Sequence, residues 1–312
     1  MMRVLVTGAD GFVGHHMVTL LKQKGIETIG TALDAKAASD LVVPVRPLNI
    51  TKTEEVASLI KHIEPTHIIH LAGVSSVMQS FFDPNQADDV NVKGTENILA
   101  SGAMLKNPPL TLLIGSSDEY GMNDGNPIRE GLLGALNPLS PYAQSKKAVE
   151  VMVENNATYL KHSIRTRSFP HIGPGQQGQF FVPEVATQIV RIERGQQRPV
   201  IGIGNLSAVR DFTDVRDVVR AYYLLLEKGV VGEVYNVCSG TAMSIEELLR
   251  KMIALSKFPV KFEHDPEKER PIDIPVLKGD GSKLKEVTGW VPEIPLDKTL
   301  KDIIEYFRSR GT

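Results

Sequence analysis

The chain has little of several features that would place it in a specialised class. Its 312 residues contain one cysteine, Cys238, which excludes an intrachain disulfide framework and fits a reducing compartment. Lys and Arg number 35 against 37 Asp and Glu, so the basic excess that a general nucleic-acid or membrane-surface binder needs is missing. The sequence has no run of about 18 apolar residues, so it predicts no transmembrane helix. The opening residues do not resemble a signal peptide. We expect a cytoplasmic protein with no nucleic-acid or membrane partner.

The first half of the chain alternates short apolar strands with amphipathic helices. We expect strands at 3–7, 27–31, 43–48, 67–71, 110–114 and 164–169, and helices at 13–24, 53–64, 88–105 and 141–162. Strands rich in β-branched residues without polar alternation are typical of a parallel sheet covered on both faces. The pattern predicts an α/β fold with a doubly wound parallel Rossmann sheet.

After about residue 170 the elements become shorter, and proline and glycine become denser. We expect helices at 182–194, 215–228, 244–255 and 296–308, and short strands near 199–201, 234–237 and 260–262. We predict a larger domain at 1–170 and a smaller C-terminal α/β lobe at 171–312, with an interleaved boundary. The charged, proline-rich segment 263–275 is expected to be a loop.

Three glycines follow the first expected strand and open the first helix. Gly8 allows a tight turn, Gly11 lets the backbone approach a pyrophosphate, and Gly14 lets helix and strand pack closely. The helix N-terminus would add free N–H groups and a positive dipole end. The spacing is G-x-x-G-x-x-G, not G-x-G-x-x-G. Its position between a strand and a helix favours dinucleotide binding over a plain structural turn.

The end of the second strand should indicate which dinucleotide binds. An acidic residue there favours NAD and a nearby arginine favours NADP. Asp34 lies slightly late for a ribose contact and no arginine is adjacent. Both NADP and NAD therefore remain candidates.

A tyrosine and a lysine occur four residues apart in one expected helix. Tyr142 and Lys146 would share a helix face, where the ammonium favours the phenolate and brings the tyrosine pKa towards working pH. Ser116, at the end of a buried strand, could hydrogen-bond the substrate oxygen that Tyr142 protonates. Ser117 is a weaker candidate. Asp118 or Glu119 could be a base, or could cap the next turn.

Other chemistries have little support in the sequence. The histidines at 15, 16, 62, 67 and 70 are scattered through helices and a strand, which predicts no metal site. No G-x-S-x-G elbow points to a serine hydrolase.

Together these features resemble the extended short-chain dehydrogenase/reductase family over nearly the whole chain. The matching segments are 7–14, 70–73, 91–95, 116–121, Tyr142-x-x-x-Lys146 and 210–215. Within the family, segments 171–176, 204–217 and 235–240 are most similar to GDP-4-keto-6-deoxy-D-mannose reductases and GDP-mannose 4,6-dehydratases.

The resemblance implies a role for individual residues. Ser116, Tyr142 and Lys146 would be the catalytic set, and Arg210 and Arg270 would hold the substrate diphosphate. Besides Tyr142 and Lys146, the implied cofactor-binding residues are Gly8, Asp10, Gly11, Phe12, Val13, Gly14, Asn49, Ile50, Leu71, Ala72 and Gly73. The remaining implied substrate-binding residues are Ser75, Ser117, Asp118 and Val182.

The resemblance also implies an activity. Domain 1–170 would bind NADP or NAD and lobe 171–312 a GDP-sugar. The enzyme would reduce the 4-keto group of a GDP-4-keto-6-deoxyhexose, giving GDP-D-rhamnose or a close isomer. A GDP-mannose 4,6-dehydratase, a nucleotide-sugar 4-epimerase and a non-catalytic dinucleotide sensor are the alternatives. Relatives pair through two helices, which would make this chain a homodimer through 88–105 and 141–162.

Three positions depart from the family pattern. Asn49 stands where an aspartate usually contacts adenine, and an amide can still pair with that base. Pro170 replaces an asparagine that contacts substrate. Asp118 falls on the base position of the dehydratases, one methylene shorter than their glutamate, which weakens the dehydration alternative.

Overall fold

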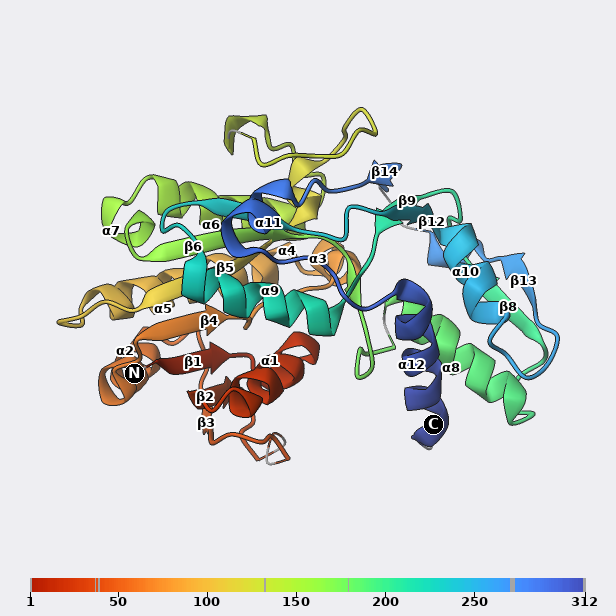
Figure 1. Ribbon diagram of the computed structural model, residues 1–312, viewed down its shortest axis with the longest axis horizontal. Helices are drawn as coiled ribbons and strands as arrows, with labels where there is room; N and C mark the ends of the chain where they lie inside the picture. Colours follow the sequence, from red (N-terminus) through yellow and green to blue (C-terminus); the bar gives the residue numbers. More distant parts are fainter. Residues whose placement is uncertain are drawn as a thin grey trace.

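A seven-stranded parallel sheet forms the centre of the molecule in the computed structural model, which describes residues 2–36, 38, 40–131, 133–178, 180–269 and 273–310 (Figure 1). Its order is β11-β6-β5-β4-β1-β2-β3. The strands are β1 (Arg3–Thr7), β2 (Glu27–Ala32), β3 (Val45–Pro47), β4 (His67–His70), β5 (Leu110–Ser116), β6 (Ser163–Ser168) and β11 (Val234–Val237). The order and the parallel pairing confirm the predicted doubly wound Rossmann fold.

Helices cover the sheet on both faces because successive strand residues point to opposite faces and both sets are apolar. Val4 and Val6 of β1 pack into one core cluster, whereas Leu5 between them packs into another. The first cluster lies under α1 (Phe12–Gln23), α9 (Val215–Lys228) and α11 (Ser282–Thr288). The opposite face is covered by α2 (Thr53–Ile63), α5 (Gly94–Ala103) and α6 (Pro141–Glu154). Because both faces are covered, functional side chains can reach solvent and ligands only at the ends of the strands.

Two long predicted helices are each divided in the structure. The helix expected at 88–105 begins with a π-helical turn, η1 (Asp88–Lys93), before α5. The helix expected at 141–162 ends as α6 at Glu154, and α7 (Ala157–Leu160) follows. Asn156 causes the second break, because its side chain accepts the N–H groups of Thr158 and Tyr159 and starts a new helix. The short helices α3 (Val77–Phe82), α4 (Pro84–Ala87) and α11 had no predicted counterpart.

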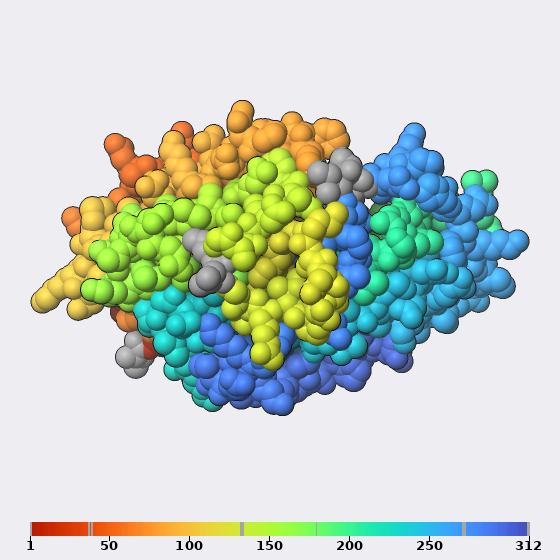
Figure 2. All heavy atoms as spheres, turned by 90° about the horizontal axis from the view of Figure 1, so that it is seen from above, coloured from red at the N-terminus to blue at the C-terminus, as the bar shows by residue number. Residues whose placement is uncertain are grey.

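The second half of the chain contributes to the central sheet as well as to a smaller lobe. Strand β11 pairs with β6 at the sheet edge, so the two halves interleave. The lobe contains α8 (Phe181–Glu193), α10 (Ile245–Ile253), α12 (Leu296–Ser309), β8 (Val200–Ile203) and β13 (Lys261–His264). Two further small sheets contain β9 (Val209–Asp211), β12 (Ala242–Ser244) and β14 (Val276–Leu277), and β7 (His171–Ile172) and β10 (Thr213–Asp214). Seen from above, the lobe forms one end of an elongated molecule (Figure 2).

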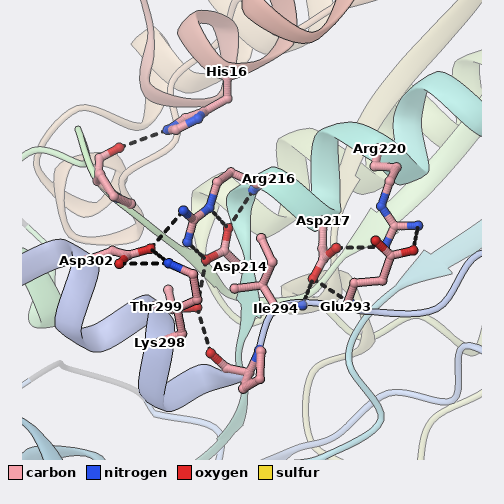
Figure 3. Close-up of polar contacts among 12 residues, drawn as sticks. His16, Asp214, Arg216, Asp217, Arg220, Glu293, Ile294, Lys298, Thr299 and Asp302 are labelled. Carbon is pink, nitrogen blue, oxygen red and sulfur yellow. Dashed lines mark hydrogen bonds and ion pairs between the residues drawn. The ribbon is translucent and has the colours of Figure 1, made fainter.

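A polar network joins the N-terminus of α9 to the lobe (Figure 3). Asp214 is buried, and its carboxylate accepts hydrogen bonds from the Thr299 hydroxyl of α12 (2.7 Å) and from Arg216 (2.7 and 2.9 Å). Asp217 accepts the backbone N–H groups of Glu293 (2.9 Å) and Ile294 (2.8 Å), just before α12. Helix α9 packs on α1 as well, so it connects the sheet layer to the lobe.

The Thr299 hydroxyl should matter for stability because its partner is a buried carboxylate. We expect Thr299→Val to lower the free energy of unfolding by about 1–3 kcal/mol, since the isosteric change removes one hydrogen bond to a buried charged group. Urea denaturation measures this. Lys298→Ala on the same helix removes an ion pair to Asp302 whose lysine is more than half exposed, and it should change stability by less than about 1 kcal/mol. Equal effects of the two substitutions would contradict the prediction.

Candidate active site

The glycine loop between β1 and α1 is a tight backbone cradle. Gly8 has a φ of +65°, and a Cβ atom there would lie 2.8 Å from the backbone nitrogen of Ala72. A Cβ atom on Gly14 would lie 2.2 Å from the carbonyl oxygen of Gly8. Gly11 precedes α1 with an extended backbone, and no side chain caps the helix. The loop therefore presents backbone N–H groups at a helix N-terminus, the arrangement that receives a phosphate.

Phe12 connects this loop to the second half of the chain. Its ring stacks on His171, with centroids 6.3 Å apart and an interplanar angle of 11°. It also meets His16 edge-on at 5.6 Å. His16 in turn shares a hydrogen bond of 2.8 Å with the carbonyl oxygen of Pro174. The start of α1 is thus held against segment 171–174.

The segment after β4 lies beside the glycine loop and beside α6. The backbone N–H of Ala72 donates to the Thr7 hydroxyl at 3.1 Å. A Cβ atom on Gly73 would lie 2.8 Å from Asn91 Oδ1 and 3.9 Å from Lys146 Nζ. Asn91 of the π-helical turn accepts the N–H of Val74 (2.8 Å) and donates to the Ser145 hydroxyl (2.9 Å). Asn91 therefore ties this segment to the helix that carries Tyr142 and Lys146.

Ser116, Tyr142 and Lys146 meet at the carboxyl end of β5. Ser116 ends the strand and is 8% exposed, and its hydroxyl accepts the N–H of Asp118 at 3.2 Å. The Ser116 side chain lies close enough to the Tyr142 hydroxyl to lower the pKa of the phenol. Lys146 Nζ lies 5.9 Å from the centroid of the Tyr142 ring and donates to the Ile114 carbonyl at 2.8 Å. The predicted catalytic set is thus one cluster.

Burial controls the protonation of this cluster. It raises the pKa of Tyr142, as does the negative charge of Asp118, whereas the Ser116 side chain acts in the opposite direction. The sequence predicts a lowered pKa for Tyr142, but desolvation dominates and raises it, so the phenol keeps its proton. Burial lowers the pKa of Lys146 to about 8, and the charge of Glu119 opposes that change.

A second group of charges lies across a cleft from Asp118. Arg210 of β9 forms an ion pair with Asp273, and its Nη1 donates to the carbonyl of Val209 at 2.8 Å. Asp273 also accepts a hydrogen bond from Asn205 at 3.0 Å. The cleft is lined by Val77, Asp118, Ser140, Arg210, Asp273 and Ile274, among others. A cation and two carboxylates therefore face one space beside the cluster.

The other predicted site residues lie in varied surroundings. Asp10 and Ser75 are exposed, Val13 is half-buried, and Ser117 is buried. Asn49 accepts both the N–H and the hydroxyl of Thr51, at 3.0 and 2.8 Å. The side chains of Ile50 and Val182 belong to two different apolar core clusters. Arg270 lies outside the described residues.

Three contributors were not assigned by sequence reasoning. Asn91 lies in a segment matching the family pattern, but its tie to Val74 and Ser145 depends on the fold. Asp273 lies in the charged segment 263–275, and sequence reasoning assigns this aspartate no functional role. The sequence leaves Glu119 open between base and cap, and the structure shows a cap, because Glu119 completes a capping box with Ser116.

Among the described residues, no group of three or more His, Cys, Asp or Glu side chains could hold a metal ion. No helix in that part of the chain is both long and apolar enough to span a membrane.

The fold and the cluster define the class of extended short-chain dehydrogenases/reductases. Within it, this chain belongs to the family described as GDP-mannose 4,6 dehydratase, which matches residues 5–303.

Known proteins of this class are similar along their whole length. GDP-6-deoxy-D-mannose reductase of Pseudomonas aeruginosa is 33% identical, covering 99% of this chain and 98% of that protein. The solved structure of RMD from Pseudomonas aeruginosa complexed with NADPH has a TM-score of 0.85 at 32% identity and covers 100% of both chains. The NAD complex of Thermus thermophilus UDP-glucose 4-epimerase has a TM-score of 0.87 at 26% identity, over 99% of this chain and 100% of that one.

The two later glycines of the loop should differ in what they tolerate. Gly14→Ala places a Cβ atom 2.2 Å from a backbone oxygen, and we expect it to destabilise the protein by about 1–3 kcal/mol or more. Gly11→Ala meets the Gly8 oxygen at 3.2 Å with an ordinary φ of −74°, and it should leave stability within about 1 kcal/mol. Thermal and urea unfolding test both variants. A Gly14→Ala protein as stable as the parent would contradict the account of the loop.

Proposed function

We propose that this protein is an NAD(P)H-dependent reductase that reduces the 4-keto group of a GDP-4-keto-6-deoxyhexose to GDP-D-rhamnose or a close isomer. The observation that carries the proposal is the cluster of Ser116, Tyr142 and Lys146 at the carboxyl end of β5, adjoining the glycine loop. The full-length similarity to a GDP-6-deoxy-D-mannose reductase supports the choice of substrate.

The residues of the cradle fit a nicotinamide dinucleotide. A pyrophosphate would bind at Gly8, Gly11 and Gly14, where side chains would fill the space or clash. Lys146 Nζ, close to Gly73, would hold the nicotinamide ribose. Asp34 lies after β2, where its carboxylate accepts the Lys36 N–H at 2.9 Å. This contact does not select between the two dinucleotides, so the cofactor would be NADP or NAD. When bound in reduced form, it supplies the hydride.

The chain's own residues would hold and move the proton. Ser116 would hydrogen-bond the carbonyl oxygen at C4, fixing it against Tyr142. Tyr142 would donate its proton to the developing alkoxide, for which its raised pKa suits it, because the phenol is protonated at neutral pH. The Lys146 ammonium would then stabilise the phenolate that remains.

Arg210 would receive the substrate diphosphate from the smaller lobe. Its planar guanidinium suits bidentate contact with phosphate. In the structure Asp273 occupies that guanidinium, so the diphosphate would have to displace a carboxylate. Arg270, Ser75, Ser117 and Val182 remain predicted substrate contacts.

Dehydration of GDP-mannose is a second candidate because Asp118 faces the same cleft as Arg210. After oxidation at C4 by the bound cofactor, the Asp118 carboxylate would remove the C5 proton of the 4-keto sugar as the C6 hydroxyl leaves as water. It is one methylene shorter than the glutamate expected there, and we therefore rank this activity below reduction.

We further propose a cytoplasmic homodimer. The lone Cys238 supports a reducing compartment. Helices α5 and α6, together with the π-helical turn η1 that directly precedes α5, would supply the dimer contact. Sedimentation of the purified protein tests the dimer directly.

The central test follows nicotinamide absorbance with GDP-4-keto-6-deoxy-D-mannose and NADPH, then NADH. We expect stoichiometric oxidation of one reduced cofactor. Tyr142→Phe should lower kcat by about 100-fold to 10,000-fold because it removes the proton donor. Tyr159→Phe, on α7 away from the cluster, is the matched control and should leave kcat unchanged. Turnover of GDP-mannose without added or consumed cofactor would instead establish the dehydratase.

Binding of GDP separates the diphosphate site from the chemistry. Arg210→Ala should weaken GDP binding by about 10-fold to 100-fold, since a charged hydrogen-bond partner is lost. Asp273→Asn should strengthen binding, because no carboxylate then competes for Arg210. Arg250→Ala on α10 removes an exposed arginine and is the control. Calorimetry measures all three, and unchanged affinity in Arg210→Ala would refute the assignment.

A further inference from the structure

A continuous chain of buried hydrogen bonds runs through the core next to the catalytic cluster. Thr7, His70 and Thr95 come from β1, β4 and α5, and each is at most 6% exposed. His70 Nδ1 lies 2.8 Å from the Thr7 hydroxyl, and its Nε2 lies 3.0 Å from the Thr95 hydroxyl. The Thr95 hydroxyl lies 2.5 Å from the carbonyl oxygen of Asn91. The imidazole therefore links the strand that enters the glycine loop to the π-helical turn η1.

The acceptors in this chain fix the direction of each bond. A carbonyl oxygen can only accept, so the single proton of the Thr95 hydroxyl is donated to Asn91. Thr95 then meets His70 only as an acceptor, which places a proton on Nε2. At the other end, the Thr7 hydroxyl accepts the N–H of Ala72 at 3.1 Å and has its own proton to donate to Nδ1. These bonds assign His70 as the Nε2–H tautomer.

A doubly protonated ring does not fit the same chain. With a proton on Nδ1, the Thr7 oxygen would receive two N–H donors, and its own proton would have no acceptor in the part of the chain that the structure describes. His70 and Lys146 also line one small cavity, so a charged ring would face the lysine ammonium. Burial and that ammonium lower the pKa of His70 to about 3, in agreement with a neutral ring.

The π-helical turn is held from outside by this chain. In η1 the N–H of Gly94 donates to the carbonyl of Asp89, five residues back. A threonine hydroxyl that bonds the carbonyl four residues back competes with the regular helical pattern, and Thr95 does so where η1 meets α5. The His70 Nε2–H keeps Thr95 in that orientation because it donates to the hydroxyl oxygen.

Asn91 passes this constraint on to the segment after β4 and to α6. Its side chain accepts the N–H of Val74 and donates to the Val74 carbonyl, at 2.8 and 3.1 Å. It also donates to the Ser145 hydroxyl, which in turn donates to the backbone carbonyl of Tyr142 at 2.7 Å. An unbroken path of bonds thus leads from the residue before Gly8 to the residue that would donate the proton.

We propose that His70, as its Nε2–H tautomer, is a positioning residue that holds the π-helical turn and thereby fixes α6, with Tyr142 and Lys146, relative to the glycine loop. This inference rests on the proposed role of Tyr142 and Lys146. His70 does not act on the substrate itself, because it is buried and both of its ring nitrogens bond threonine hydroxyls of the protein.

Long-range ¹H–¹⁵N NMR of protein labelled with ¹⁵N-histidine tests the tautomer at pH 7, and it needs neither cofactor nor substrate. The His70 ring is assigned from its loss in His70→Gln. We expect a protonated Nε2 and an unprotonated Nδ1. His62, which is exposed on α2, is the internal reference for a ring outside the buried chain. A proton on Nδ1 of His70 would overturn the inference.

Two substitutions separate the ends of the chain. His70→Gln can place an amide N–H where Nε2 donates to Thr95, whereas His70→Asn can place an amide oxygen where Nδ1 accepts from Thr7. We expect His70→Asn to lower kcat by about 10-fold to 100-fold because α6 loses its fixed position, and His70→Gln to retain most of kcat. Thr95→Val removes the same link and should match His70→Asn. Equal losses in the two His70 variants would contradict a positioning role.

Thr53→Val is the matched control for Thr95→Val. It removes another hydroxyl contact with α5, a hydrogen bond of 3.0 Å to Asn97, and should leave kcat unchanged. If His70→Asn does not fold, as judged by circular dichroism, Thr95→Val decides, since valine preserves the shape of the side chain. A kcat equal to that of the parent in Thr95→Val would then overturn the inference.

Amide hydrogen exchange keeps this inference distinct from the proposed function. The N–H of Val74 is held by Asn91, so we expect its exchange to be faster in His70→Asn and Thr95→Val than in His70→Gln. Equal exchange in all three variants would overturn the positioning role. A protein that oxidises no nicotinamide cofactor but shows the expected tautomer and exchange pattern would refute the proposed function while supporting the role of His70 in the fold of the site.

Discussion

The covering of the central sheet on both faces is the constraint on which the rest of the structure depends. Backbone groups of the strands are satisfied within the parallel ladder, and the side chains of β1 alternate between two apolar clusters. Polar chemistry is therefore concentrated where strands end. Gly8 follows β1, Gly73 follows β4 and Ser116 ends β5, and these three neighbouring strands bring the cradle and the serine together. The single helix α6 then places Tyr142 and Lys146 against that edge.

Buried charge is tolerated here because nearly every buried ion has a specific partner. Arg167 and Glu150 form a two-point pair under η2 (Ser117–Tyr120). Asp211 is buried and accepts the N–H groups of Ser239 and Gly240, each at 2.9 Å. Asp214 is also buried and accepts a hydrogen bond from the Thr299 hydroxyl of α12. Such pairs add little net stability, but loss of one member is costly, so they hold one arrangement of sheet and lobe. Oε2 of Glu119 stands out against this pattern as a buried carboxylate oxygen without a hydrogen bond from the part of the chain that the structure describes.

Desolvation and charge act in opposite directions at the cluster, and their balance suits proton donation. Lys146 at four residues from Tyr142 suggests an activated phenolate, but burial of the phenol dominates and keeps it protonated. A reductase needs a donor in that state, with a cation beside it to receive the negative charge after transfer. Lys146 has a pKa of about 8, so a fraction of the molecules lose this positive charge at working pH.

The sequence by itself determined the parallel α/β fold, the glycine loop and the Tyr142–Lys146 pair, because these depend on local periodicity and short spacing, and it placed Ser116 at the end of a buried strand. It also indicated Arg210 through a local motif. Tertiary structure alone decided what surrounds them. Asp273 lies 63 residues from Arg210, and Thr95 lies 25 residues from His70, so no spacing links either pair. The π-helical turn that aims Asn91 at Ser145, the placement of β11 in the central sheet and the raised pKa of Tyr142 likewise arise from packing. Burial and long-range pairing are properties of the folded chain, and they set the charge states on which the proposed chemistry depends.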